Sequence, residues 1–203
     1  HVPLREPDFA VDWDRLKASL NDRTRLLIVN SPHNPSGAVL EPEDLDQLAA
    51  VLRPFATYLL SDEVYEHVIF DESRHATVLA HPELAERSFA VFSFGKTYHA
   101  TGWKIGYVVA PPAMTAELRK VHQYVCFAAV TPLQHALADF MREQPEYALG
   151  MPEFYAAKRD RFVALLAPSR LEVVPARGTY FQLADYRRVS ASPDVEFARW
   201  LTV

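Results

Sequence analysis

Short apolar runs alternate with segments of helical periodicity along the first half of the chain. Four runs have the length of a strand, namely RLLIVN (25–30), YLLSD (58–62), SFAVFSF (88–94) and KIGYVVA (104–110). Trp13, Leu16 and Leu20 recur at helical spacing before the first run, and a second helical segment lies between Pro42 and Pro54. A first helical turn tolerates Pro42, whereas Pro54 ends the helix. The pattern predicts helices and strands in alternation.

The predicted strands are apolar at almost every position rather than at alternate positions. Strands of this kind are typical of a sheet that helices cover on both sides, and alternation with helices favours parallel pairing. We therefore predict an α/β fold with a mostly parallel sheet and helices on both of its faces.

From Pro112 onward the periodicity is helical. Further helices are predicted over Ala113–Cys126, Pro132–Glu143 and Glu146–Leu166, and Pro168 ends this stretch. The change of pattern at this point predicts a domain boundary. A first domain would cover 1–167, and the beginning of a smaller α+β domain would cover 168–203.

The last segment predicts two strands and a helix. LEVVP (171–175) and TYFQLAD (179–185) lie on either side of Arg177-Gly178, which indicates a hairpin turn. Pro193 then opens a final helix.

Composition excludes several classes of protein. The 203 residues are 49% hydrophobic and include 3 Trp, 9 Tyr and 12 Phe, which excludes intrinsic disorder. A net charge of −5 without a basic stripe argues against a nucleic-acid partner, and no apolar run approaches the roughly 18 residues of a membrane span. The single cysteine, Cys126, fits a reducing compartment, so we expect a cytoplasmic protein. The histidines form no H-E-x-x-H motif, and no metal site is predicted.

Polar residues follow each of the first three predicted strands. Asn34 follows the first, Asp62 ends the second with Tyr65 just beyond it, and Ser93 and Lys96 follow the third. Ligands of open α/β sheets bind at the carboxyl ends of the strands. These side chains are therefore expected to converge on one edge of the sheet.

This set suits a pyridine-ring cofactor that acts as an electron sink. Such a cofactor needs an amine for a Schiff base, a carboxylate at its ring nitrogen, donors for its phenolate oxygen and a phosphate seat. The candidates are Lys96 for the amine, Asp62 for the ring nitrogen, Tyr65 and Asn34 for the phenolate oxygen, and Ser93 with Lys104 for the phosphate.

Other interpretations of the same motifs carry less weight. Ser93-x-x-Lys96 is also the spacing of serine β-lactamases, but here it follows a strand and the chain has no S-D-N triplet. Ala90 replaces the first glycine of a phosphate-binding loop that would end in G-K-T at 95–97. Alone, Lys96 is compatible with a surface lysine and Asp62 with a helix N-cap.

Two neighbouring sets of polar residues receive no catalytic role. Asp62 and Glu63 are neighbours in a strand and point to opposite faces, which argues against a pair of acids that act together. His33, His99 and His122 lie in or beside the motifs, and we expect each to be a hydrogen-bonded polar residue rather than a ligand.

Four segments together resemble a known family. NSPHNPSG (30–37), SDEVYEHVIF (61–70), SFGKTYHATGWKIGYVVAPP (93–112) and RGTYF (177–181) are similar to the fold-type I pyridoxal-phosphate aminotransferases of class I/II. The segments TGWK (101–104) and 122–140 resemble the branch with methionine and kynurenine aminotransferases. Many relatives have arginine where this chain has Lys104, and lysine neutralises phosphate without the bidentate fork.

The resemblance implies an activity and an assembly. It implies a transaminase that moves the amino group of methionine, an aromatic amino acid or a kynurenine-like donor to a 2-oxo acid, by a ping-pong mechanism through a Schiff base on Lys96. It also implies a pyridoxal-phosphate large domain, a homodimer, and a chain that corresponds to the central portion of a longer enzyme and is inactive alone. The alternatives are a C–S β-lyase of the same fold and a non-catalytic cofactor-binding fragment.

Overall fold

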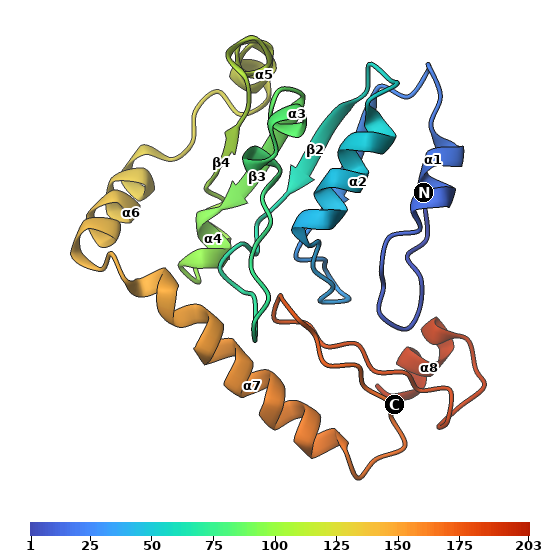
Figure 1. Ribbon diagram of the computed structural model, residues 1–203. Helices are drawn as coiled ribbons and strands as arrows, with labels where there is room; N and C mark the ends of the chain where they lie inside the picture. Colours follow the sequence, from blue (N-terminus) through green and yellow to red (C-terminus); the bar gives the residue numbers. More distant parts are fainter.

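The computed structural model describes residues 1–203, and a four-stranded sheet lies at its centre (Figure 1). The strands, in their order across the sheet, are β1 (Leu26–Asn30), β2 (Tyr58–Asp62), β3 (Ser88–Ser93) and β4 (Gly106–Val109). β1 pairs with β2, and β2 with β3, in parallel, whereas β4 runs antiparallel to β3. All four predicted strands are confirmed, with bounds that differ by two residues at most.

Six of the eight α-helices match a predicted helix, and two short ones have no predicted counterpart. The α-helices are α1 (Trp13–Ser19), α2 (Pro42–Leu52), α3 (Pro82–Ala85), α4 (Phe94–Thr97), α5 (Pro112–Val125), α6 (Thr131–Glu143), α7 (Met151–Leu166) and α8 (Asp194–Trp200). Single 3₁₀ turns form η1 (Val78–Ala80), η2 (Thr101–Trp103) and η3 (Tyr147–Gly150). None of these helices has the length and apolar content that a crossing of the bilayer requires.

Local capping explains where the first two helices begin. The Asp12 side chain accepts a hydrogen bond from the Arg15 N–H at 3.0 Å and so caps α1. At α2, the side chains of Glu41 and Asp44 each accept a hydrogen bond from the other residue's backbone N–H, and Pro42 occupies the first turn. Both starts therefore satisfy backbone donors that the helix itself leaves unpaired.

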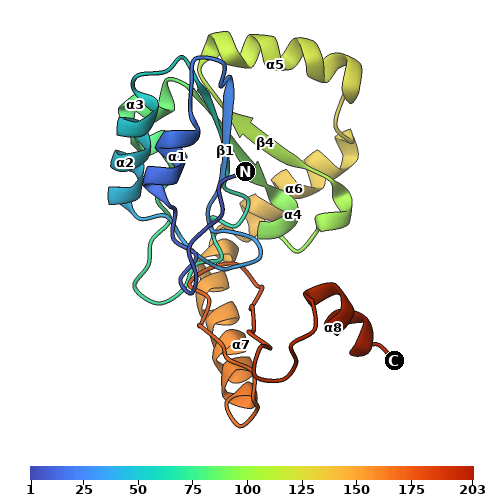
Figure 2. The same cartoon turned by 90° about the vertical axis from the view of Figure 1, so that its right-hand side faces the viewer.

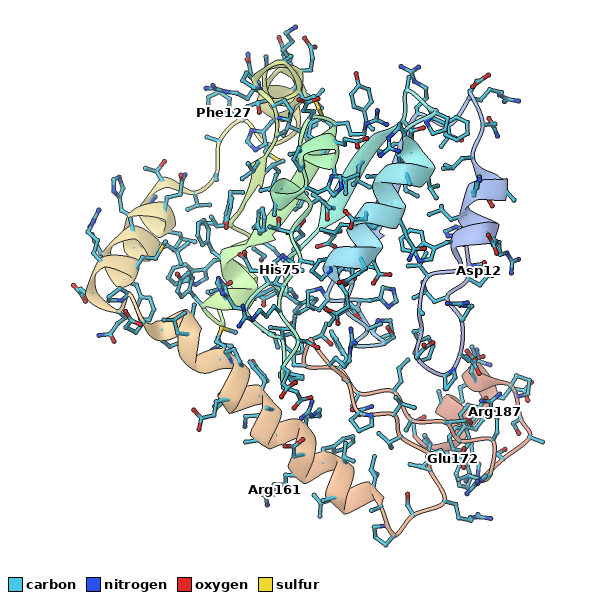
Figure 3. All side chains as sticks on the ribbon, viewed as in Figure 1. Asp12, His75, Phe127, Arg161, Glu172 and Arg187 are labelled. Carbon is cyan, nitrogen blue, oxygen red and sulfur yellow. The ribbon has the colours of Figure 1, made fainter.

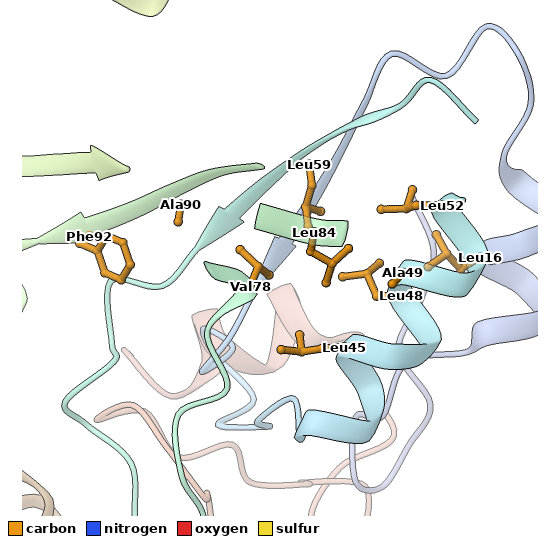
Figure 4. Packing of buried hydrophobic residues seen from close by; sticks show 10 residues of the cluster. All are labelled: Leu16, Leu45, Leu48, Ala49, Leu52, Leu59, Val78, Leu84, Ala90 and Phe92. Carbon is orange, nitrogen blue, oxygen red and sulfur yellow. The ribbon is translucent and has the colours of Figure 1, made fainter. Parts of the chain in front are cut away.

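The hydrophobic core lies on one face of the sheet. Figure 2 shows α1, α2 and α3 together on this side, and Figure 4 shows their side chains meeting those of β2 and β3. The buried cluster consists of Leu16, Leu45, Leu48, Ala49, Leu52, Leu59, Val78, Leu84, Ala90 and Phe92. Packing of this face holds the strands in place.

The opposite face of the sheet is exposed over β1 and β4. Ile28 in β1 is 63% exposed and Leu26 is 44% exposed, and every residue of β4 is exposed. The α/β class and the mostly parallel sheet are confirmed. The second layer of helices expected from the doubly apolar strands is absent over β1 and β4 in this chain.

The two strands predicted at 171–175 and 179–185 do not form. A single antiparallel bridge joins Glu172 to Asp185. Beyond it, the Gln182 side chain accepts a hydrogen bond from the Ala176 N–H and donates one to the Val174 carbonyl. Because a side chain takes the backbone groups that a neighbouring strand would use, the hairpin ladder is not extended. The boundary at residue 168 stays a prediction.

Arg177-Gly178 lies at the predicted reversal of the chain, between the bridged residues Glu172 and Asp185, and is inserted between two loops. The Gly37 carbonyl accepts hydrogen bonds from both N–H groups, each at 3.0 Å, and the Arg177 carbonyl accepts one from Phe70. Gly37 has φ +71°, and a Cβ there would lie 2.4 Å from the Cβ of Ala176. Only glycine allows this close approach between the loop after β1 and the C-terminal segment.

We expect Leu48→Ala to lower the free energy of unfolding by about 2–5 kcal/mol, because the fully buried side chain leaves a cavity in the core. Leu165→Ala is the matched control, since Leu165 is also helical but is 67% exposed, and its effect should stay within about 0.5 kcal/mol. Urea unfolding followed by circular dichroism measures both. Equal losses would contradict the position of the core.

Candidate active site

The carboxyl ends of the three parallel strands lie level with one another. Asn30 pairs with Asp62 across β1 and β2, and Asp62 pairs with Val91 across β2 and β3. The loops that follow the strands therefore leave the sheet at the same edge, as predicted. α7 passes beneath this edge (Figure 1).

Asp62 and Tyr65 lie together at the end of β2. Asp62 is half-buried, and its Oδ1 accepts a long hydrogen bond of 3.3 Å from the Val64 N–H. Tyr65 is buried, and its hydroxyl lies 3.5 Å from that of Tyr180. Burial raises the pKa of Tyr65, and the neighbouring Tyr180 and the charge of Asp62 add to this rise. The phenol of Tyr65 therefore stays protonated beside the carboxylate.

Lys96 is in α4, directly after β3, and its amine faces two aromatic rings. Its Nζ donates a hydrogen bond of 3.2 Å to the Tyr180 hydroxyl. The same nitrogen lies 5.5 Å from the centroid of the Tyr65 ring. The structure thus brings Lys96 and Tyr65 together, next to Asp62.

Tyr180 is the residue of this group that the sequence analysis did not assign. It lies 84 residues after Lys96 and contacts that lysine and Tyr65. The signal was present in the segment RGTYF, which carried part of the family resemblance. No local pattern connects this segment with the lysine.

Ser93 and Lys104 lie around the same end of β3 without a hydrogen bond between them. Ser93 is the last residue of β3 and pairs with Gly106 at the start of β4. Lys104 precedes Gly106 by two residues, is exposed and has φ +56°. The antiparallel turn therefore returns a lysine to the strand end where Ser93 lies.

The loop that carries Asn34 is connected to the end of β2 through a second asparagine, Asn30. The Asn34 backbone N–H donates to Asn30 Oδ1 at 2.8 Å, and Asn30 Nδ2 donates to the Asp62 carbonyl at 2.9 Å. The Asn34 side chain is exposed and makes no hydrogen bond to Tyr65 or Lys96. Its loop is anchored to the end of β2, while its amide remains free.

A small open cavity of about 350 Å³ lies beside the Lys96 amine. Its walls are Gly95, Lys96, His99, Thr101, Tyr155 and Tyr180. A larger cavity of about 1220 Å³ separates the N-terminal segment from residues 172–187, and neither Lys96 nor Asp62 lines it. The reactive side chains therefore favour the smaller cavity as the candidate site.

Glu63 points away from this site into the protein, as strand alternation predicts. Its carboxylate accepts hydrogen bonds from the Ser61 hydroxyl at 2.9 Å and the Val78 N–H at 3.1 Å. Its Oε2 lies 2.7 Å from Nε2 of His75, which Figure 3 places in the middle of the molecule. Burial raises the pKa of Glu63, but hydrogen bonds from His75, Thr77 and Val78 outweigh it and hold the pKa below its ordinary value.

Comparison with known proteins decides the family. The family model for aminotransferases of class I and II matches residues 1–202 of this chain. The chain belongs to this family. Members of the class I and II aminotransferases use pyridoxal phosphate, so the resemblance seen in the motifs is confirmed.

Individual aminotransferases resemble the chain along nearly its whole length. A methionine aminotransferase of Escherichia coli strain K12 is 54% identical over 201 residues, which are 99% of this chain and 52% of that protein. The human kynurenine–oxoglutarate transaminase 3 is 33% identical over 96% of this chain and 46% of its own length. The crystal structure of an Escherichia coli protein with a methionine aminotransferase function superposes with a TM-score of 0.94 at 54% identity, over 98% of this chain and 53% of that one. The chain spans about half the length of these relatives.

The side chains at the strand ends fit the cofactor of the class I and II aminotransferases. The set contains the primary amine of Lys96, the carboxylate of Asp62 and the buried phenol of Tyr65. A cavity opens beside the amine. Ser93 and Lys104 add a hydroxyl and a positive charge at the neighbouring strand end. This donor set matches an aldehyde, a ring nitrogen, a phenolate and a phosphate.

We expect Glu63→Gln to lower the free energy of unfolding by about 1–3 kcal/mol at neutral pH, because it removes a buried charge and replaces one of the two acceptor oxygens, which meet three donors, by an NH₂ group. The pKa of Glu63 in the folded protein lies below the ordinary 4.5. The stabilisation by its charge is therefore complete at a pH above the ordinary pKa of 4.5, and it is lost as the pH falls through the lower pKa of the folded protein.

Urea unfolding between pH 7 and about pH 3 tests this expectation, and the difference between wild type and Glu63→Gln should shrink at the acid end. Glu83→Gln is the control, since Glu83 pairs with Arg53 on the surface. A difference that is independent of pH would contradict the role of the Glu63 charge.

Proposed function

We propose that this protein is a pyridoxal-phosphate-dependent aminotransferase that transfers the amino group of an L-amino acid to a 2-oxo acid. The observation that carries the proposal is the position of the Lys96 amine. It lies at the carboxyl end of β3, bonded to Tyr180 and above the ring of Tyr65, with Asp62 at the end of the adjacent strand. Membership of the family supports the same conclusion.

Each residue at the strand ends has a role in holding the cofactor. Lys96 would bond the aldehyde as a Schiff base, and Asp62 would pair with the protonated ring nitrogen. The Tyr65 hydroxyl and the free amide of Asn34 would donate to the phenolate oxygen, while Ser93 and Lys104 would bind the phosphate. When bound, the cofactor withdraws electrons from the substrate α-carbon.

Lys96 also moves the proton in this proposal. Once the substrate amine has taken its place on the cofactor, the Lys96 amine would be free, and Nζ would take the proton from the substrate α-carbon and deliver it to the former aldehyde carbon. The Tyr180 hydroxyl accepts a hydrogen bond from Nζ at 3.2 Å and so orients the amine for the proton transfer. The 2-oxo acid product leaves before the second 2-oxo acid binds, which gives ping-pong kinetics.

The proposed donors are methionine, aromatic amino acids or kynurenine-like amino acids. Relatives named for methionine and kynurenine support this class, as do the aromatic rings of Tyr65, Tyr155 and Tyr180 around the lysine. Product analysis separates transfer from the C–S β-lyase reaction of the same fold. A new amino acid supports transfer, whereas pyruvate and ammonia from a cysteine conjugate would contradict it.

We also propose that the protein forms a homodimer and works in the cytoplasm. The end of α5 and the loop after it present apolar side chains to solvent, with Tyr124 87% exposed and Phe127 84% exposed (Figure 3). A second copy is the occupant that the family resemblance implies for such a surface. Sedimentation velocity of the intact protein tests the dimer, and a monomer at micromolar concentration would contradict it. The lone free Cys126 supports a reducing compartment, which fractionation would test.

We expect Lys96→Ala to abolish the visible absorbance band that pyridoxal phosphate gives when it is bound to a lysine, because the variant lacks the amine. Absorbance of the protein after addition of the cofactor measures this loss. Lys120→Ala is the control, since Lys120 lies on the surface of α5 and pairs with Glu117. A band that persists without Lys96 would show that another lysine bonds the cofactor.

We expect Asp62→Asn to bind the cofactor but to slow the half-reaction with an amino acid by about 10²–10³-fold. The variant has no charge to keep the ring nitrogen protonated, and loss of one such electrostatic contact costs that much. Stopped-flow absorbance measures the half-reaction. Asp139→Asn on the surface of α6 is the control, and an equal rate in Asp62→Asn and this control would exclude the role.

A further inference from the structure

His99 lies three residues after Lys96, and hydroxyl groups bind both of its ring nitrogens. Nδ1 lies 2.8 Å from the Tyr147 hydroxyl, and Nε2 lies 2.8 Å from the Tyr155 hydroxyl. His99 has φ +53°, a backbone conformation that is uncommon for residues other than glycine, although asparagine, aspartate and histidine adopt it more often than the rest. The chain thus holds an unfavourable conformation at a point where the side chain gains two hydrogen bonds.

The two hydrogen bonds have a defined direction when the imidazole is neutral. One ring nitrogen then carries a hydrogen and the other a lone pair, so one tyrosine accepts a hydrogen bond and the other donates one. Burial raises the pKa of Tyr155, and the nearby Tyr180 and Tyr147 add to this rise, so the Tyr155 hydroxyl keeps its proton. His99 therefore fixes two tyrosines of η3 and α7 against the loop that carries the lysine.

Tyr155 connects His99 back to Lys96 through space. Its ring packs against that of Tyr180, with 5.7 Å between the centroids. The Tyr180 hydroxyl accepts the hydrogen bond from Lys96 Nζ at 3.2 Å. The main chain joins His99 to Lys96, so the contacts form a closed circuit of four residues. Its members are Lys96, Tyr180, Tyr155 and His99, and all four line the cavity of about 350 Å³.

The backbone of the loop is held independently of this circuit. The Gly95 carbonyl accepts hydrogen bonds from the Ala100 N–H at 3.0 Å and from the Thr101 hydroxyl at 3.1 Å. A Cβ on Gly95 would lie 2.9 Å from the Cα of Thr101, so the loop is tightly closed. A change of the His99 side chain therefore acts mainly on Tyr155 and Tyr180, while the loop keeps its own bonds.

We propose that His99 is a positioning residue for Lys96. It holds Tyr155, Tyr155 holds the ring of Tyr180, and the Tyr180 hydroxyl orients the lysine amine toward the cavity. Tyr147 is bonded to the other ring nitrogen of His99 and lies outside the cavity wall, so it anchors η3 without reaching the amine. The inference rests on the proposed function, because it assigns the lysine as the group that bonds the cofactor.

The rate at which the intact protein bonds pyridoxal phosphate tests the inference without any substrate. The visible band is followed after the cofactor is added to cofactor-free protein, and borohydride reduction with mass spectrometry identifies the lysine. His99→Asn keeps a residue that tolerates positive φ but is too short to reach both hydroxyls. Tyr155→Phe removes one hydroxyl, and Tyr147→Phe is the matched control.

We expect His99→Asn and Tyr155→Phe each to slow formation of the band by about five- to tenfold, the effect of one lost hydrogen bond. The double variant should be no slower than the slower single variant, since both changes break the same circuit. Tyr147→Phe should stay within about twofold of the wild type. Thermal unfolding of each cofactor-free variant confirms that the protein is folded.

Two outcomes would overturn the positioning role alone. These are wild-type rates in both His99→Asn and Tyr155→Phe, or an equal slowing in Tyr147→Phe, which would mean that any loosening of α7 has the same effect. A wild-type protein that forms no band would overturn the proposed function and this role together. Should His99→Asn fail to fold, Tyr155→Phe and Tyr147→Phe decide the question.

Discussion

The parallel pairing of β1, β2 and β3 sets the level at which each strand ends, and the geometry of the site depends on it. Asn30, Asp62 and Val91 lie side by side, so the residues that follow them leave the sheet together. The core of α1, α2 and α3 packs on one face and holds this register. A slip of one residue in β2 would turn Asp62 into the core and Glu63 toward the cavity.

Asp62 and Glu63 show how one strand end serves two purposes. The first carboxylate remains half-buried at the end of β2 with a single long hydrogen bond from Val64, so it is free for a ligand. The second is fully buried and bonded to Ser61, His75 and Val78, and it holds η1 to the strand. The alternation of side chains keeps the two charges on opposite sides of the backbone, which lets one be reactive and the other structural.

Local patterns in the sequence predict the parts of the structure that local forces determine. Periodicity and proline positions predict the four strands of the sheet and six of the eight α-helices, and the motifs place Asp62, Tyr65 and Lys96 at one sheet edge. Tyr180 and the contacts of His99 with Tyr147 and Tyr155 escape prediction. They join segments 48 to 84 residues apart, which only the packing of α7 and the C-terminal segment brings together.

The two predicted strands that do not form have a similar cause. The segments 171–175 and 179–185 have the apolar content of strands, but the Gln182 amide binds the Val174 carbonyl and the Ala176 N–H, and the Gly37 carbonyl holds the turn between the segments. Competition by a side chain and a distant loop is invisible to a propensity that considers each segment alone.

The outer edge of β1 is open to pairing with a further strand. β1 is the last strand on its side of the sheet, and Leu26 and Ile28 beside this edge are exposed. An unpaired strand with apolar neighbours is a template for any extended segment in solution. An extended segment that supplies N–H and C=O groups to β1 can therefore lengthen the sheet at this edge.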